Sequence, residues 1–269
     1  MKVEAIKTRI VRVNEINLED LLTESLDNLA KKSGKSSDEI LPENSVVVIS
    51  SKVVSLCENN IVPKSEIEKR DLIIAESDFY YFPKSQKSDY EWHFAIKNGC
   101  LAPAAGIDES NVDDDFYVLW PQNSQQTANR IREFLSEKFA RKNLGVLIID
   151  STCLPPLKRG TIGIFLAFSG FLPMCNLAGT EDLFGRKFQF EQHAIAGGLA
   201  AAANLAIGEG AECTPIAILS GLDFVEFVMR NPTREEIDSA FVEREIDLYA
   251  PFLNSVKWQK GGGGYKKIS

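Results

Sequence analysis

The chain has 269 residues, 44% of them hydrophobic and 25% charged, which is an ordinary balance for a globular protein. Its formal charge of −8 argues against nucleic-acid binding through a broad basic face, and no apolar run is long enough to span a membrane. Five cysteines without CxxC spacing favour reduced core thiols over a disulfide framework or a zinc knuckle. The N-terminus begins with strand-like alternation and shows no signal peptide, so we expect a cytoplasmic protein.

The first part of the chain is predicted to alternate between strands and helices. Residues Val3 to Val13 alternate as a strand does, and leucines at helical spacing predict a helix from Leu18 to Lys32 that ends at Gly34. Val46 to Ile49 predict a short buried strand that ends in Ser50-Ser51-Lys52. A lysine at this place either binds an anion or simply caps the strand in water, and the segment alone favours the second interpretation.

The next segment is predicted to contain a helix and a hairpin. Lys64 to Ser77 form a helical pattern of mixed charge, and the aromatic residues Phe79 to Phe82 follow it. These rings either stack on a planar ligand or, more in keeping with the usual role of aromatic residues, pack beneath a loop. Trp92 to Ile96 and Cys100 to Ala104 flank Gly99 and predict a hairpin.

The centre of the chain is predicted to form an amphipathic helix and two buried strands. The helix runs from Ser124 to Lys142. The apolar run Leu144 to Ile149 predicts a strand that is buried on both faces, and Thr161 to Phe168 predicts a second strand.

The last third begins with an alanine-rich helix, predicted from Glu191 to Ile207, in which Gly197-Gly198 indicates close approach of a backbone or a ligand. Pro215 to Leu219 predicts a strand, and Pro232 starts a predicted helix that runs to Tyr249. The four glycines of residues 261–264 predict a flexible, basic tail. We therefore expect a catalytic module over residues 1–225 and a C-terminal helix with its tail over residues 226–269.

Several loops carry side chains that suit a metal and a phosphate. Asp108 and Glu109 lie in a short polar stretch after Gly106, where oxygen ligands for a hard cation and ordinary Asx-turn chemistry explain the composition equally well. Asp150 and Ser151 follow the buried strand, at the place where open α/β sheets usually bind ligands. The same loop continues to Lys158-Arg159, and Glu209 follows the alanine-rich helix.

No familiar nucleotide loop or nucleophile elbow is present, and two histidines far apart in the sequence make a Ser-His-Asp triad a poor interpretation. Carboxylates therefore occur on three loops, with Lys52, Lys158 and Arg159 as the cations. If these loops converge, they form a metal-phosphate or two-metal site of the kind that transfers phosphoryl groups by positioning and charge neutralisation.

Four blocks in a fixed order resemble a known family, the coenzyme F420-0:γ-glutamyl ligases. The blocks are Ala105 to Val112, Asp150 to Gly160, Gly179 to Arg186, and the alanine-rich helix running into Gly208-Glu209. With Ser51-Lys52-Val53-Val54 near the start, the resemblance covers most of residues 3–225. It implies a two-lobed mixed α/β fold, an intertwined homodimer, and an enzyme that adds L-glutamate to a carboxylate of a deazaflavin precursor through an acyl phosphate.

The resemblance also implies roles for individual residues. Mg2+ or Mn2+ would be held by Asp108, Asp150, Ser151 and Glu209, while GTP or ATP would be bound by Lys52, Ser151, Lys158, Arg159 and Glu209. Asp150, Lys52 and Arg159 would be the catalytic residues. The small-molecule partners are then the nucleotide, L-glutamate and an acceptor with a free carboxylate; no nucleic acid and no membrane are expected.

Two departures from the family pattern leave the acceptor open. The loop from Asp150 to Gly160 lacks the usual glycine near its start and is one residue longer, and Gly197-Gly198 replaces a common acidic pair. A folate or other pterin acceptor, joined by the same bond formation, is one alternative. An inactive family member that acts as a binding protein is the other.

Overall fold

A five-stranded mixed sheet forms the centre of the structure, a computed structural model that describes residues 1–83, 93–113, 115–153 and 158–266. The strands lie in the order β1 (Lys2–Ile6), β12 (Ile216–Ser220), β2 (Ser45–Ser50), β8 (Leu144–Cys153) and β9 (Thr161–Ser169). β2 and β8 run parallel, and the other neighbours are antiparallel. The strands predicted from Val46, Leu144, Thr161 and Pro215 are confirmed.

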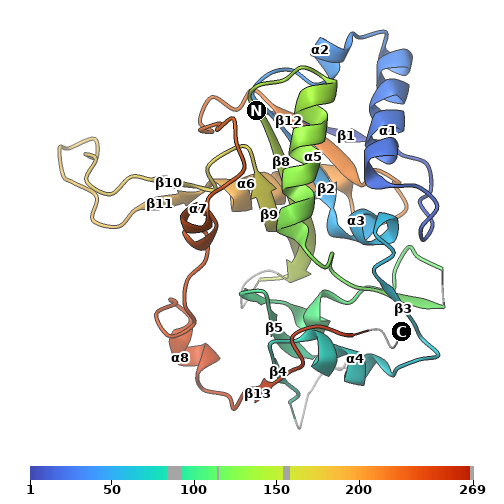
Figure 1. Cartoon of the computed structure of the whole chain (residues 1–269). Coiled ribbons are helices and arrows are strands. Elements are labelled where there is room, and N and C mark those ends of the chain that lie inside the picture. Colours follow the sequence, from blue (N-terminus) through green and yellow to red (C-terminus); the bar gives the residue numbers. More distant parts are fainter. Residues whose placement is uncertain (84–92, 114, 154–157, 267–269) are drawn as a thin grey trace.

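Helices cover both faces of this sheet (Figure 1). The helices α1 (Leu18–Ser33), α3 (Ser51–Cys57) and α5 (Ser124–Lys138) pack on one face, and α6 (Ile195–Ile207) packs on the other. Because alternate residues of a strand point to opposite faces, Val47 and Ile49 of β2 enter the first core while Val46 and Val48 enter the second. Burial on both faces explains the continuous apolar runs, and the predicted α/β class is confirmed.

A smaller region lies beneath the main sheet in Figure 1. Its four-stranded sheet has the order β13 (Gln259–Lys260), β4 (Phe79–Tyr81), β5 (Phe94–Lys97) and β6 (Cys100–Leu101). It also contains α4 (Lys69–Glu76), the short 3-10 helix η1 (Pro103–Gly106), and the paired strands β3 (Ile61–Pro63) and β7 (Phe116–Val118). The predicted hairpin around Gly99 is confirmed as β5 and β6, although Trp92, its first predicted residue, lies outside the described residues.

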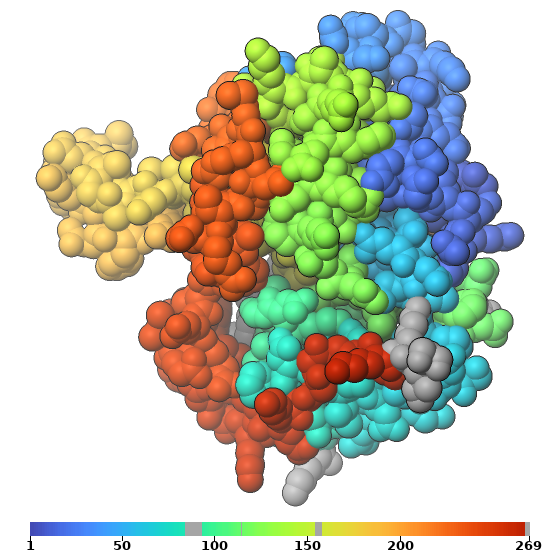
Figure 2. All heavy atoms as spheres, in the orientation of Figure 1, coloured from blue at the N-terminus to red at the C-terminus, as the bar shows by residue number. Residues whose placement is uncertain are grey.

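A hairpin arm, residues 174–194, projects away from the rest of the molecule (Figures 1 and 2). It is built on β10 (Met174–Asn176) and β11 (Gln192–Ala194), and its apolar side chains Leu183, Phe184 and Phe190 are exposed. The remaining elements are the short helices α2 (Ser37–Ile40), α7 (Arg234–Asp238) and α8 (Ala250–Leu253). Within the described residues, no helix has both the length and the apolar character needed to cross a membrane.

The predicted strand from Val3 to Val13 is wrong beyond Ile6. β1 pairs with β12 up to Ile6, which lies opposite Ile216. On the partner chain, Cys213 has φ +58°, and this left-handed conformation breaks the extended backbone that further pairing needs. Residues 7–13 consequently leave the sheet as a loop.

Two predictions for the last third of the chain are also wrong. The helix predicted from Pro232 to Tyr249 is only α7, which begins with a capping box of Thr233 and Glu236 but contains no fully buried residue to support a longer helix. The four glycines of residues 261–264 are docked and not flexible, since their N–H groups donate hydrogen bonds to carbonyls in and just after α4.

The alanine-rich helix begins four residues later than predicted, at Ile195, because residues 192–194 pair in β11. It is buried against the sheet as expected, but its glycine pair is not a close contact within the described chain. A Cβ at Gly198 would meet nothing within 4 Å, and one at Gly197 would meet only the Cβ of Ala194.

Candidate active site

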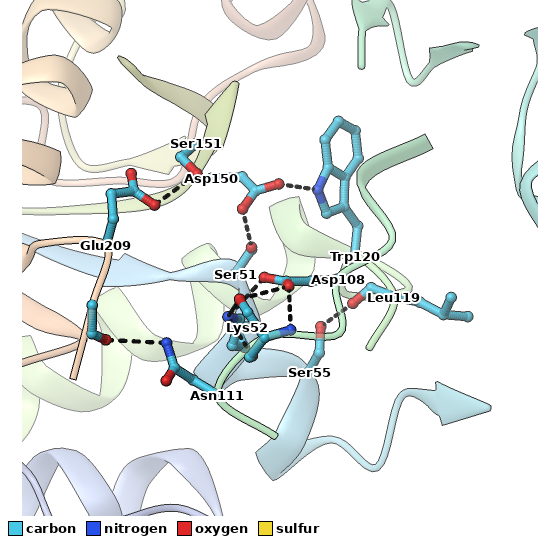
Figure 3. Close-up of polar contacts among 12 residues, drawn as sticks. Ser51, Lys52, Ser55, Asp108, Asn111, Leu119, Trp120, Asp150, Ser151 and Glu209 are labelled. Atoms are coloured by element: carbon cyan, nitrogen blue, oxygen red, sulfur yellow. Dashed lines mark hydrogen bonds and ion pairs between the residues drawn. The ribbon is translucent and has the colours of Figure 1, made fainter. Parts of the chain in front are cut away.

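A cavity of about 480 Å³ opens where the parallel pairing of β2 with β8 ends; β8 itself continues to Cys153, so Asp150 and Ser151 lie within this strand and not after it as predicted. It is lined by residues from five segments: 8–13, 50–56, 108–113, 149–151 and 204–215. Since β2 and β8 are parallel, their carboxyl ends meet at one edge of the sheet, and Ser51 and Asp150 follow the paired residues Ser50 and Ile149. The three predicted carboxylate loops therefore converge, as Figure 3 shows for Asp108, Asp150 and Glu209.

Asp150 is held by two neutral side-chain donors. Ser51 Oγ donates to Asp150 Oδ1 at 3.0 Å, and the indole Nε1 of Trp120 donates to Oδ2 (Figure 3). Burial, together with the smaller effect of the nearby charge of Asp108, raises the pKa of Asp150 to about 6 despite these hydrogen bonds. The side chain thus carries a proton more readily than an exposed aspartate does.

Asp108 is paired with a cation from the start of α3. The distance from Lys52 Nζ to Asp108 Oδ2 is 2.7 Å, and the same ammonium donates to Ser110 O at 2.8 Å. Ser110 N and Oγ donate to Asp108 Oδ1 at 2.8 and 2.9 Å, so the Asx-type turn that the composition suggested is present. Although burial opposes the shift, Lys52 and Ser110 hold the pKa of Asp108 below its ordinary value.

Glu209 faces the cavity from the end of α6. Gly208, with φ +81°, turns the chain after the helix. Glu209 then accepts hydrogen bonds from Asn204 Nδ2 at 2.9 Å, Ser151 Oγ at 3.2 Å and Thr161 Oγ1 at 3.3 Å. Glu209 and Ser151 therefore form one group on the α6 side of the sheet.

Three other predicted residues are not among the described residues that line the cavity. Glu109 pairs with Lys69 and, at 3.1 Å, with Lys64, which together hold its pKa below the ordinary value against the effect of burial. Lys158 and Arg159 are exposed in the loop between β8 and β9. The longer loop noted in the sequence falls largely on residues 154–157, which lie outside the described residues.

Several residues that line the cavity or contact Asp150 were not predicted from the sequence. Trp120 stands between Leu119 and Pro121, where no periodic pattern or motif marks it. Arg9 and Arg12 were assigned to the first strand, yet the loop that carries them lines the cavity. Only Ser51 had a local signal, the hydroxyl pair that ends β2.

The oxygen ligands of the cavity suit a hard divalent cation. In the part of the chain that the structure describes, no three His, Cys, Asp or Glu side chains converge closely enough to hold a metal by themselves. Magnesium, however, is commonly held by one or two carboxylates with phosphate and water oxygens as the other ligands. Asp108 and Asp150, whose charges interact, fit this type of site.

The comparisons with known proteins agree with one another. The sequence profile described as F420-0:gamma-glutamyl ligase matches residues 6–221. A relative named coenzyme F420:L-glutamate ligase, from Methanocaldococcus jannaschii, is 38% identical over 125 residues, which are 46% of this chain and 49% of that protein. Relatives of the same name are 38% identical over 120 residues in Methanosarcina barkeri, covering 45% and 46% of the two chains, and 30% identical over 196 residues in Methanothermobacter thermautotrophicus, covering 68% and 77%.

The matched segment spans about half the length of the first two relatives and about three quarters of the third. The family profile extends over most of the chain and includes every segment that contributes a carboxylate to the cavity. The chain belongs to the F420-0:gamma-glutamyl ligase family.

Proposed function

We propose that the chain is a nucleotide- and metal-dependent ligase that joins L-glutamate to the carboxylate of coenzyme F420-0. The observation that carries the proposal is the convergence of Asp108, Asp150 and Glu209, from three separate segments of the chain, on one cavity that also contains Lys52. Its volume of about 480 Å³ lies in the usual range for small-molecule sites. The name of the relatives supports the choice of substrates.

Asp108 and Asp150 would hold Mg2+ or Mn2+, with Ser151 and Glu209 as further oxygen ligands. A cation there would supply charge neutralisation for the phosphates of GTP or ATP. It would also compensate the buried charge of Asp150, whose two side-chain donors are both neutral.

Lys52 is the cation best placed to bind a phosphate. Its ammonium already lies in the cavity, 2.7 Å from Asp108, and keeps its position through Ser110. Lys158 and Arg159 are proposed to bind phosphates or substrate carboxylates. Both residues shortly precede Thr161, the first residue of β9, and Thr161 contacts Glu209. The loop that carries them therefore ends beside the site, and their charges suit either anion.

In the proposed reaction, an oxygen of the acceptor carboxylate attacks the γ-phosphorus and the nucleoside diphosphate leaves. The resulting acyl phosphate is attacked at its carbonyl carbon by the amine of glutamate, which loses a proton as inorganic phosphate departs. Lys52 and Arg159 would stabilise the negative charge on the transferred group, and Asp150 would keep the reacting groups in position.

We also propose that the chain forms a homodimer through the hairpin arm. Leu183, Phe184 and Phe190 on the arm are 99%, 82% and 85% exposed, and Leu205 on the outer face of α6 is 85% exposed. Exposed apolar side chains gathered on a projecting element are typical of an interface with another chain. A second copy of this chain would cover them.

The function is tested by measuring glutamate addition by mass spectrometry. The purified chain is incubated with Mn2+, GTP or ATP, L-glutamate, and either coenzyme F420-0 or a folate monoglutamate. We expect a gain of one glutamyl unit on F420-0, its loss in Asp150→Asn, and its retention in Asp27→Asn, a matched change on the exposed side of α1.

Each other outcome has a distinct meaning. A gain on the folate alone would keep the reaction and replace the acceptor. Nucleotide and Mn2+ binding without a gain on either molecule would contradict both proposed acceptors. A chain that binds neither nucleotide nor metal would instead be the inactive binding protein.

A further inference from the structure

The side chain of Trp120 contacts the site from the smaller region of the molecule. Trp120 follows β7 and is only 4% exposed. Its indole N–H is bonded to one oxygen of Asp150, while Ser51 holds the other oxygen (Figure 3). Two donors on the two oxygens fix the orientation of the carboxylate plane, as outer partners do for metal ligands in general.

Two residues pack against the indole ring of Trp120: Gly106 lies at its edge, and Lys97 lies over its face. A Cβ at Gly106 would lie 2.2 Å from Trp120 Nε1, so only glycine lets the backbone approach the ring so closely. Gly106 precedes Asp108 by two residues, and the same turn therefore shapes the contacts of both site aspartates. Lys97 Nζ lies 5.6 Å from the centroid of the ring.

Lys97 belongs to a buried ion pair that the C-terminal segment completes. Lys97 and its partner Glu76 are 7% and 5% exposed. Glu76 Oε2 accepts from Lys97, and its other oxygen accepts from the backbone N–H of Tyr265 at 2.6 Å. A buried charge that loses part of its hydrogen bonding is strongly disfavoured, so the pair depends on the segment that contains Tyr265.

That segment, the C-terminal strap of residues 259–265, lies across the smaller region (Figure 2). It pairs with β4 through β13, and its glycines then supply hydrogen bonds to carbonyls that the end of α4 leaves without a helical partner. Each of these four bonds is 2.9 Å long: Gly261 N to Asp78 O, Gly262 N to Ile74 O, Gly263 N to Ser77 O, and Gly264 N to Ala75 O. A Cβ at Gly261 would lie 2.1 Å from Ser77 O, so close approach explains the glycine.

We propose that Trp120 is a positioning residue for Asp150, and that the C-terminal strap keeps Trp120 in place through the buried pair of Lys97 and Glu76. The inference rests on the proposed role of Asp150 as a metal ligand. The strap lies beyond residue 221, where the family match ends, so a segment outside the matched residues contributes to the site. Its contribution is to order the carboxylate before metal and nucleotide bind.

The test measures Mn2+ binding by titration calorimetry in the presence of GDP, with the full chain. Trp120→Phe keeps an aromatic ring but removes the N–H donor, and we expect Mn2+ to bind about 10- to 100-fold more weakly. Gly261→Ala displaces the strap and is expected to weaken binding in the same direction. Lys260→Ala, an exposed change in the same strap, leaves the glycine contacts intact and serves as the control with unchanged binding.

The double variant decides whether the strap acts through Trp120. We expect Trp120→Phe with Gly261→Ala to bind Mn2+ no more weakly than Trp120→Phe alone, since coupled residues are not additive. Additive losses overturn the link to the strap, and normal binding by Trp120→Phe overturns the positioning role. In Trp120→Phe and in Gly261→Ala, the KM for nucleotide should rise while the KM for glutamate stays unchanged. A general destabilisation of the fold would change both KM values.

Asp150→Asn in the same titration separates this inference from the proposed function. If Asp150→Asn binds Mn2+ as the parent does, the assigned metal ligand is wrong and the inference falls with it. If Asp150→Asn loses binding while Trp120→Phe keeps it, only the inference is overturned. Thermal unfolding checks that each variant folds. If Trp120→Phe does not fold, the Mn2+ binding of Gly261→Ala alone decides whether the inference stands.

Discussion

Because burial raises the pKa of Asp150 from 3.8 to about 6, the folded chain keeps a proton there that the unfolded chain loses at lower pH. Without metal, this group therefore contributes stability below pH 3.8 that is lost as the pH rises to about 6. At about 1.4 kcal/mol per pKa unit, the loss is at most about 3 kcal/mol. We expect Asp150→Asn in EDTA to have a higher free energy of unfolding than the parent above this interval, measured by urea denaturation.

The comparison is made across the same pH interval in parent and variant. The difference between them should grow from low pH to neutral pH and then stay constant; a difference that does not change with pH would contradict the assigned titration. Added Mn2+ should reverse the order, because a ligand that binds the folded parent stabilises it and the variant lacks the carboxylate.

At the residue scale, sequence reasoning found the side chains that follow the ends of strands and helices. Asp150, Lys52 and Glu209 were predicted to share a site, provided that their loops converge, because each follows an apolar run in the sequence; in the structure Asp150 lies within β8. Trp120 could not be found in this way, since its contact with Asp150 spans 30 positions and depends on how the two regions pack. Lys158 and Arg159 were included for their charge, and their roles stay predictions.

At the element scale, the contact between α6 and β9 depends on Gly163. A Cβ there would lie 2.4 Å from the carbonyl oxygen of Ala200 and 2.6 Å from the Cβ of Asn204, which holds Glu209. We expect Gly163→Ala to lower the free energy of unfolding by about 1–3 kcal/mol, as overpacking does, and to reduce glutamate addition by moving Glu209. Chemical denaturation and the mass-spectrometric assay measure the two effects.

Gly198→Ala is the matched control on α6. A Cβ at this position meets nothing within 4 Å, so alanine should stabilise the helix by up to about 1 kcal/mol. A Gly163→Ala chain as stable and active as the parent would show that the helix can shift without consequence. A loss of stability at Gly198 would indicate that something outside this chain packs against the helix.

Elements were predictable where one local pattern decided them. The helix α1, with its leucines capped by Asn17 and ended by Gly34, formed as expected, and so did the apolar run of β8, although this strand continues beyond Ile149 to Cys153. The end of β1 was decided instead by the left-handed Cys213 on the partner chain, which no pattern within residues 3–13 contains. Gly261 to Gly264 were taken as flexible because only the packed structure shows the carbonyls that their N–H groups bind.

At the scale of the whole molecule, the exposed arm gives the proposed homodimer its test. The arm projects from the body (Figure 2). Its side chains Leu183, Phe184 and Phe190 are largely exposed. Burying apolar area contributes about 25 cal/mol per Å², so several large side chains are needed for a stable interface. The double variant Phe184→Glu with Phe190→Glu should therefore dissociate the dimer, shown by light scattering after size exclusion.

Lys187→Glu changes the charge on the same arm without removing an apolar side chain, and it should leave the parent dimer intact. If the parent chain elutes as a monomer at every concentration, the proposed dimer is wrong. If the double variant stays dimeric, the interface lies elsewhere on the molecule. A single chain already forms the cavity from its own segments. Glutamate addition by the monomeric variant then tests whether activity needs the second copy, and retained activity would show that one chain suffices.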